Sequence, residues 1–287
     1  MLKTLKLMRG AVSLLNPSQA QKMAAKAPEI GLIASTSIDY AAMEDFLIPA
    51  AVPHEERLTL MRMVHRASDA GAPDNLDLVL YHAGSGPCPA GCFLFAPEDP
   101  GQTVRQIVEA RDDIGLALAR HYLPFRKPVV DACIQAVCRE NAMFALATAL
   151  PNVIPSLIEL PWAMGEFASD TAFLTLNQVR MAFLIAAAVG RPVGLSEQKF
   201  EIGSIVAGAF GWRAIARELA GKIPLGGGLI PKGAIAYAGT YVVGKGIERL
   251  YRVGGQLSRA ERRQLYSDGL AKGRLLVQAA EARPPAG

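Results

Sequence analysis

The sequence predicts a mainly α-helical protein, a helical bundle of glycine- and alanine-rich helices with a small α/β segment in the N-terminal half. Hydrophobic residues make up 51% of the 287 positions, enough to bury a sizeable core. Aromatic residues are only 7%, and Ala and Gly supply much of the apolar character. This composition suits closely packed helices better than a β-sandwich, whose strands favour aromatic and β-branched residues.

The first region, residues 1–72, is expected to be amphipathic and helical. Residues 2–15 place Lys3, Lys6 and Arg9 on one helical face and apolar side chains over most of the rest. This pattern is typical of a helix that lies in a membrane interface, and equally of a surface helix packed on its own protein. Prolines interrupt the helical pattern that follows.

A small α/β segment is predicted over residues 73–112. Two short strand candidates, 76–81 and 92–95, flank a Gly/Pro-rich loop, and a helix from about Gln102 to Arg111 follows. The two strands could form a hairpin or belong to a small sheet. The segment is too short for a full dinucleotide-binding domain.

Residues 113–252 form an apolar helical module in this interpretation. Residues 141–158 carry no charge, but Pro151 and Pro155 make a clean membrane-spanning helix improbable and favour a re-entrant, surface-lying or kinked core segment. A later helix carries small residues at a spacing of three or four, which puts them on one face. These candidates for a membrane or helix-packing face, and for self-association, are Gly233, Ala236, Thr240 and Gly244.

Residues 253–287 are expected to form a basic helical tail, which begins at a capping box of Ser258 and Glu261. Residues 1–28 carry five bases and no acid, residues 245–287 carry nine bases and four acids, and the stretch between is net acidic. Basic ends fit an anionic membrane surface or an ordinary solvated face. No nucleic acid is expected, because no basic stretch is interleaved with stacking aromatics.

Motifs for chemistry are sparse. No G-x-x-x-x-G-K-[ST] loop occurs, and we expect no cofactor. Cys88, Cys92 and His82 could supply three metal ligands, but the two tight pairs usual in structural zinc sites are missing, so no metal is expected. A Cys92–His121 nucleophile pair would make the protein an enzyme, a minor alternative. The first 28 residues lack a signal-peptide pattern, which favours the cytoplasm and free thiols.

Charged residues inside the apolar half are candidates for buried ion pairs. Desolvated charges need partners, and Asp170–Arg180 and Glu166–Arg217 are the pairs that helix packing could form. Such charges are structural pairs or surface charges in one interpretation, and serve gating or partner binding in the other. The candidates are Glu166, Asp170, Arg180, Arg213 and Arg217.

Several sequence blocks within residues 141–251 occur in a specific order. The blocks are Ala149-Leu150-Pro151-Asn152-Val153-Ile154-Pro155, Leu174-Thr175-Leu176-Asn177-Gln178 with Met181, Ala186-Ala187-Ala188-Val189-Gly190, Gly211-Trp212-Arg213-Ala214-Ile215-Ala216-Arg217-Glu218-Leu219, Ile223-Pro224, and Lys232 with Ala236-Tyr237-Ala238-Gly239-Thr240-Tyr241 and Gly244. In this order they resemble a bacterial family catalogued as domain of unknown function number 697, which includes YcjF-like proteins.

The resemblance implies a module that follows a P-loop GTPase domain in many members and is associated with a membrane, with no enzymatic activity to carry over. This chain departs from the family pattern because its N-terminal half lacks the phosphate loop. We therefore expect a stand-alone relative: a non-enzymatic, membrane-associated helical module, a partner or regulator of a separate GTPase, at the cytoplasmic side of the inner membrane or in the cytoplasm. The alternative is a soluble helical binding protein of unknown ligand.

Overall fold

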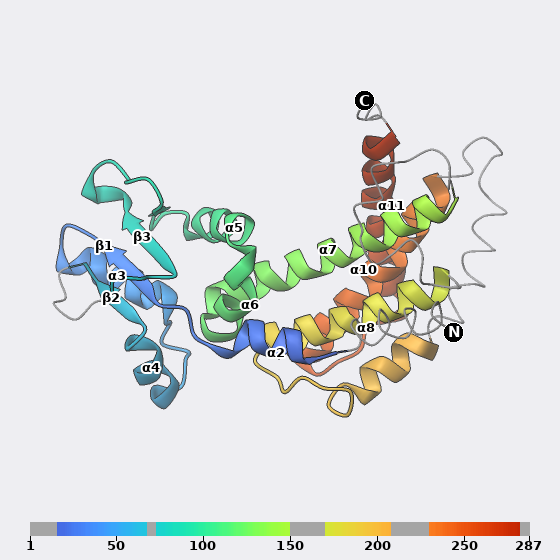
Figure 1. Cartoon of the computed structure of the whole chain (residues 1–287), viewed down its shortest axis with the longest axis horizontal. Helices are drawn as coiled ribbons and strands as arrows, with labels where there is room; N and C mark the ends of the chain where they lie inside the picture. Colours follow the sequence, from blue (N-terminus) through green and yellow to red (C-terminus); the bar gives the residue numbers. More distant parts are fainter. Residues whose placement is uncertain (1–15, 68–72, 150–169, 208–229, 282–287) are drawn as a thin grey trace, which may run out of the picture. The chain divides into compact units, whose positions relative to one another are not determined.

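The computed structural model describes residues 16–67, 73–149, 170–207 and 230–281, and it is mainly α-helical with one small parallel sheet (Figure 1). The chain divides into two compact units. The α/β unit comprises residues 18–132 with 186–192. The helical unit comprises residues 133–185 and 193–287 with residues 1–17. The predicted amphipathic helix 2–15 lies outside the described residues.

The α/β unit is built on a four-stranded parallel sheet with the strand order β2-β1-β3-β4. Its strands are β1 (Ile30–Ile33), β2 (Val64–Arg66), β3 (Leu78–His82) and β4 (Phe93–Phe95). Its helices are α2 (Ser18–Ala25), α3 (Ser37–Leu47), α4 (His54–Met61), α5 (Pro100–Ala110) and α6 (Asp112–His121), with a 3₁₀ turn η1 (Ala83–Ser85) after β3. The central strands are short apolar runs, as parallel strands covered by helices require.

Local sequence explains where the helices of this unit begin. Thr36 caps α3 by accepting a hydrogen bond from the backbone N–H of Asp39. Asp99 caps α5 in the same way through the N–H of Gln102, and Pro100 follows in the first turn, where its missing N–H costs nothing. Asp112 and Asp113 open α6, and Arg120 and His121 close it, which matches the helix dipole at both ends.

The strand prediction for residues 73–112 needs one correction. The structure contains both predicted strands, but β3 and β4 pair in parallel, with Leu80 opposite Phe93, so the hairpin alternative is wrong. The sheet also includes β1 and β2, from a region interpreted as helical. Parallel neighbours need a crossover between them, and the η1 turn with the Gly/Pro-rich loop supplies it here.

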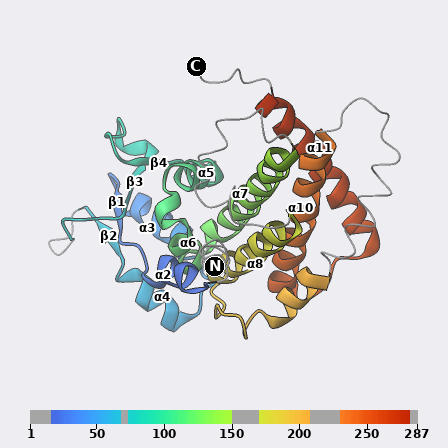
Figure 2. The ribbon, with the colours of Figure 1, turned by 45° about the vertical axis from the view of Figure 1, so that its right-hand side comes forward.

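The helical unit contains most of α7 (Leu123–Ala149) and of α8 (Asp170–Ala188), together with α10 (Ile230–Val253) and α11 (Arg259–Glu281). The helix α7 continues through Pro128 rather than ending there. Helices α10 and α11 pack along each other (Figure 2). The predicted capping box of α11 is confirmed: the backbone N–H of Glu261 donates to Ser258 Oγ at 3.2 Å, and the N–H of Ser258 donates to Glu261 Oε2 at 2.8 Å.

Within the described ranges, no helix combines the length and the apolar character that a bilayer crossing requires. Residues 150–169 and 208–229, which include part of the predicted apolar module, lie outside the described residues.

Candidate functional site: a polar network in the helical unit

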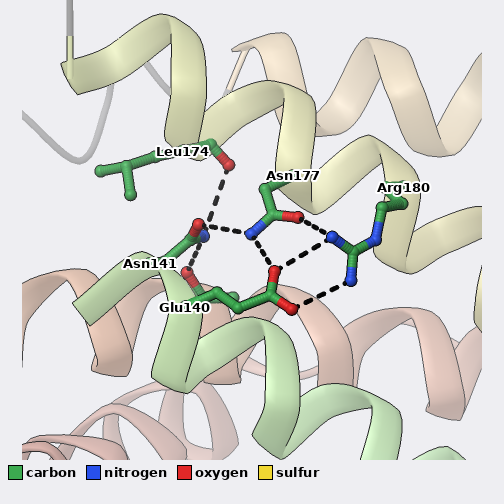
Figure 3. A network of polar contacts seen from close by, with 6 residues as sticks. Glu140, Asn141, Leu174, Asn177 and Arg180 are labelled. Carbon is green, nitrogen blue, oxygen red and sulfur yellow. Dashed lines mark hydrogen bonds and ion pairs between the residues drawn. The ribbon is translucent and has the colours of Figure 1, made fainter. Parts of the chain in front are cut away.

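An ion pair joins two helices of the helical unit. Arg180 on α8 faces Glu140 on α7, and its guanidinium donates one hydrogen bond to each carboxylate oxygen, at 3.0 Å to Oε2 and 3.1 Å to Oε1 (Figure 3). Both side chains are about three-quarters buried. This two-bond geometry is the strongest form of an Arg–carboxylate pair, and it fixes the two helices against each other.

Two buried amides continue the network from this pair into the helix interface. Asn177 on α8 donates to Glu140 Oε2 and to Asn141 Oδ1, both at 2.9 Å, and its own carbonyl oxygen accepts from Arg180 at 3.0 Å. Figure 3 shows the Asn177 amide between the ion pair and Asn141. Asn141 and Asn177 are both fully buried, so the hydrogen bond between them is shielded from water.

The inner end of the network reaches a third helix. Asn141 Nδ2 donates to Thr240 Oγ1 on α10 at 2.8 Å, and Gln178 Nε2 donates to the same oxygen at 3.3 Å. The Thr240 hydroxyl in turn donates to the backbone carbonyl of Ala236 at 2.9 Å. Hydrogen bonds between side chains thereby link helices α7, α8 and α10.

The residues of this polar network hold helices in position. The network contains an amide-rich, hydrogen-bonded chain and one ion pair, without a thiol, an imidazole or a second carboxylate that could share a proton. Buried polar groups cost free energy unless every member is satisfied, and a satisfied network selects one register between helices. The network therefore aligns three helices of the unit.

The structure gives Arg180 a partner that the sequence interpretation missed. The suggested partner Asp170 starts the same helix, ten residues or roughly 15 Å of helix axis away, which is too far for an ion pair. Glu140 could have been found, because it is the acid that immediately precedes the charge-free stretch 141–158. Glu166, Arg213 and Arg217 lie outside the described residues, and the Asp170 side chain is not described.

The predicted small-residue face lies against neighbouring helices of the same unit. A Cβ added at Gly233 would come within 3.2 Å of the Ala142 carbonyl oxygen on α7, and one at Gly244 within 2.8 Å of Ile134 on α7. Thr240 is in the polar network, and Ala236 supplies its carbonyl acceptor. The close approach that this face was predicted to allow occurs here between helices of one chain.

In the α/β unit, His82 and Asp39 meet at the carboxyl end of the sheet, near the point between β1 and β3 where the strand order reverses. His82 is buried, its Nδ1 accepts from the backbone N–H of Gly84 at 3.2 Å, and its Nε2 lies 3.7 Å from Asp39 Oδ1. A neutral ring with Nδ1 as acceptor carries its proton on Nε2. In this tautomer the Nε2–H of His82 points toward Asp39, at a separation that is longer than a hydrogen bond.

The proposed Cys92–His121 pair has no support from the groups around either residue. Burial lowers the pKa of His121, whose Nε2 lies 3.3 Å from the carbonyl oxygen of Ala24 on α2. Burial, and then the neighbouring Cys88 thiol, raise the pKa of Cys92, the opposite of an activated nucleophile. Within the described ranges, no three His, Cys, Asp or Glu side chains gather as metal ligands.

Comparisons of the chain with protein-family models, with curated proteins and with solved structures found no match. The resemblance of residues 141–251 to the YcjF-like family stays a prediction.

Proposed function

We propose that this protein is a non-enzymatic, membrane-associated helical module at the cytoplasmic side of the inner membrane. The observation that supports this most directly is a short segment of the helical unit, residues 195–206, that exposes three large apolar side chains, together called the patch: Leu195, Phe200 and Val206. These residues are 53%, 76% and 44% exposed. Phe200 and Val206 belong to a helical stretch over 199–207.

The chain that follows the patch has the composition of a membrane-interface segment. Residues 208–229 include Phe210, Trp212 and many aliphatic residues, with three bases and one acid. Apolar side chains beside an excess of bases suit an anionic bilayer surface, where each base contributes roughly 1 kcal/mol. Moving an exposed Phe or Leu side chain fully out of water contributes about 1.5–3 kcal/mol. The patch and this segment together favour a lipid surface as the partner.

The family resemblance adds a protein partner to the same proposal: a separate GTPase, which this module would hold or regulate at the membrane. A second candidate function is a soluble helical binding protein. The observation that favours it is the inward packing of Gly233 and Gly244 on α7, since a face filled by its own chain is not free to contact lipid. The two candidates differ in whether the protein partitions to membranes.

Vesicle flotation tests the membrane proposal. We expect the purified protein to float with vesicles of phosphatidylcholine and phosphatidylserine, and Phe200→Asp to reduce the floated fraction several-fold, because each buried apolar side chain contributes roughly 1.5–3 kcal/mol. The matched control is Ile38→Asp in the α/β unit, an 81% exposed apolar residue away from the patch in sequence, which should float like the unmodified protein.

Fractionation of cells completes the experiment. Release from the membrane pellet only by detergent supports insertion, and release by high salt alone limits the contact to electrostatic attraction of the basic ends. A protein that neither floats nor sediments with membranes contradicts the proposal and favours the soluble binding protein. Equal flotation of Phe200→Asp and the unmodified protein contradicts the role of the patch.

A further inference from the structure

Two thiols flank one turn in the connection between β3 and β4. The connection runs through Gly86 and Gly91, whose φ angles of 100° and 86° lie in the left-handed region that favours glycine. The backbone N–H of Cys92 donates to the carbonyl oxygen of Pro89 at 3.2 Å, which closes a β-turn. Cys88 precedes this turn by one residue and Cys92 ends it.

The turn holds the Cys88 thiol against the second cysteine. Cys88 Sγ lies 3.7 Å from the carbonyl oxygen of Cys92 and 3.7 Å from that of Pro89. Cys88 is exposed and Cys92 is half-buried, so soluble oxidants reach the first thiol directly. The Cys88 thiol is also close enough to contribute, after burial, to the raised pKa of Cys92.

The other two cysteines provide a contrast within the same chain. Cys133 and Cys138 lie on α7, and Cys138 is buried in the helical unit. Burial raises the pKa of Cys133 to about 11 and raises that of Cys138 further. A thiol with a high pKa is rarely ionised near neutral pH, and only the thiolate attacks an oxidant. Cys88 is the exposed thiol among the four cysteines, so oxidation should begin in the β3–β4 connection.

We propose that Cys88 and Cys92 are a redox-sensitive dithiol that forms a reversible disulfide across the Pro89-Ala90-Gly91 turn, with glutathione disulfide as the oxidant. The Cys88 thiolate attacks one sulfur of glutathione disulfide, and one glutathione thiolate leaves. The Cys92 thiolate then attacks Cys88 Sγ in the mixed disulfide, and the second glutathione thiolate leaves. The protein loses two electrons and two protons, and glutathione disulfide becomes two glutathione molecules.

The disulfide would constrain the loop that follows His82. Of the two left-handed glycines of the connection, Gly91 lies inside the segment that the new bond closes, and Gly86 lies two residues before Cys88. The backbone that holds the His82 ring through Gly84 begins the same connection. Oxidation would thus fix the path of the chain where it enters β4, and reduction by glutathione would release it.

Thiol counting in glutathione buffers tests the proposal. The full-length protein is equilibrated at several ratios of glutathione to glutathione disulfide, quenched in acid, denatured and alkylated with N-ethylmaleimide. We expect four alkylated cysteines under reducing ratios and two under oxidising ratios. Trypsin places Cys88 and Cys92 in one peptide, residues 67–105, without another cysteine. Its oxidised form should lack both alkyl groups and weigh two hydrogens less than the dithiol peptide.

Single variants separate a disulfide from simple thiol modification. Cys92→Ser should trap glutathione on Cys88 as a stable adduct, because the resolving thiol is gone. Cys133→Ala should lose two alkylated cysteines upon oxidation, just as the unmodified protein does. The proposal is wrong if peptide 67–105 keeps two free thiols under oxidising ratios, if both cysteines carry glutathione, or if the disulfide forms between two copies of the chain.

Discussion

Replacing Asn141 by alanine is expected to lower the free energy of unfolding of the helical unit by about 2–4 kcal/mol, since an orphaned buried polar group alone costs about 1–3 kcal/mol and a cavity adds to that. Asn141 is fully buried and bonds to side chains on two other helices. Removing its amide leaves one Asn177 N–H without its acceptor and removes the link from α7 to Thr240. Urea unfolding followed by circular dichroism measures the loss.

A helical amide on the surface is the matched control. Gln264 on α11 donates to Asp268 at 2.9 Å, and the contact is exposed. Water replaces such a bond when it is removed, so Gln264→Ala should change the free energy of unfolding by less than about 0.5 kcal/mol. If both alanine variants unfold at the same urea concentration as the unmodified protein, the buried network does not hold the three helices together.

The outer end of the network should behave differently from its centre. Glu140 and Arg180 each keep about a quarter of their side-chain surface in water. If one of them is replaced, water can therefore partly solvate the charge that is left without its partner. The fully buried amides lack that compensation. The stabilising effect of the network is therefore concentrated at Asn141 and Asn177, away from the charged residues that draw attention in the sequence.

The helical character of the chain was predictable from composition, while the network was not. In a single helix, Asn141, Asn177 and Thr240 each resemble ordinary polar positions, and their burial follows only when α7, α8 and α10 meet. Arg180 was identifiable as a charge in an apolar stretch, but its partner Glu140 lies on another helix, and acids nearer in sequence looked equally suitable. Pairing between helices is tertiary information that local patterns do not contain.

The sheet, too, could be predicted only in part from the sequence. β3 was predicted from its apolar run, but β1 is only four residues long and lies between helical patterns. A short apolar run cannot be distinguished from part of a buried helix by periodicity. The direction of β4 relative to β3 depends on the course of the connecting loop, whose length and glycines are compatible with a hairpin as well as with a crossover. His82 and Asp39 were overlooked as a pair because that pairing depends on the sheet order.

Two glycines of α11 that the sequence interpretation did not select lie close to the backbone of α10. A Cβ added at Gly273 would lie 2.8 Å from the Cα and 3.0 Å from the carbonyl oxygen of Ala234 on α10. Gly269, one turn earlier, would meet the Cα of Ala238 at 2.9 Å. These neighbours are backbone atoms, which cannot rotate away as a flexible side chain can. Any side chain at either position must push the two helices apart.

Gly273→Ala is accordingly expected to destabilise the helical unit by about 1–3 kcal/mol, the usual cost of overpacking, although alanine favours a helix over glycine by about 1 kcal/mol. The matched control is Gly246→Ala on α10. Its added Cβ meets only Leu257 Cδ1 at 3.6 Å, an ordinary contact. There the helix preference acts without a clash, so Gly246→Ala should stabilise the unit by up to about 1 kcal/mol.

The two substitutions are expected to change the free energy of unfolding in opposite directions. The comparison is decisive because the same chemical change is made in two helices that pack against each other. Helix preference alone predicts that both variants gain stability, while the close approach of α10 and α11 predicts a gain at Gly246 and a loss at Gly273. Urea unfolding of the two variants side by side distinguishes these outcomes. A gain at Gly273 would mean that α11 does not approach Ala234 as closely as the backbone contacts require, and the glycines of α11 would then have no role in packing.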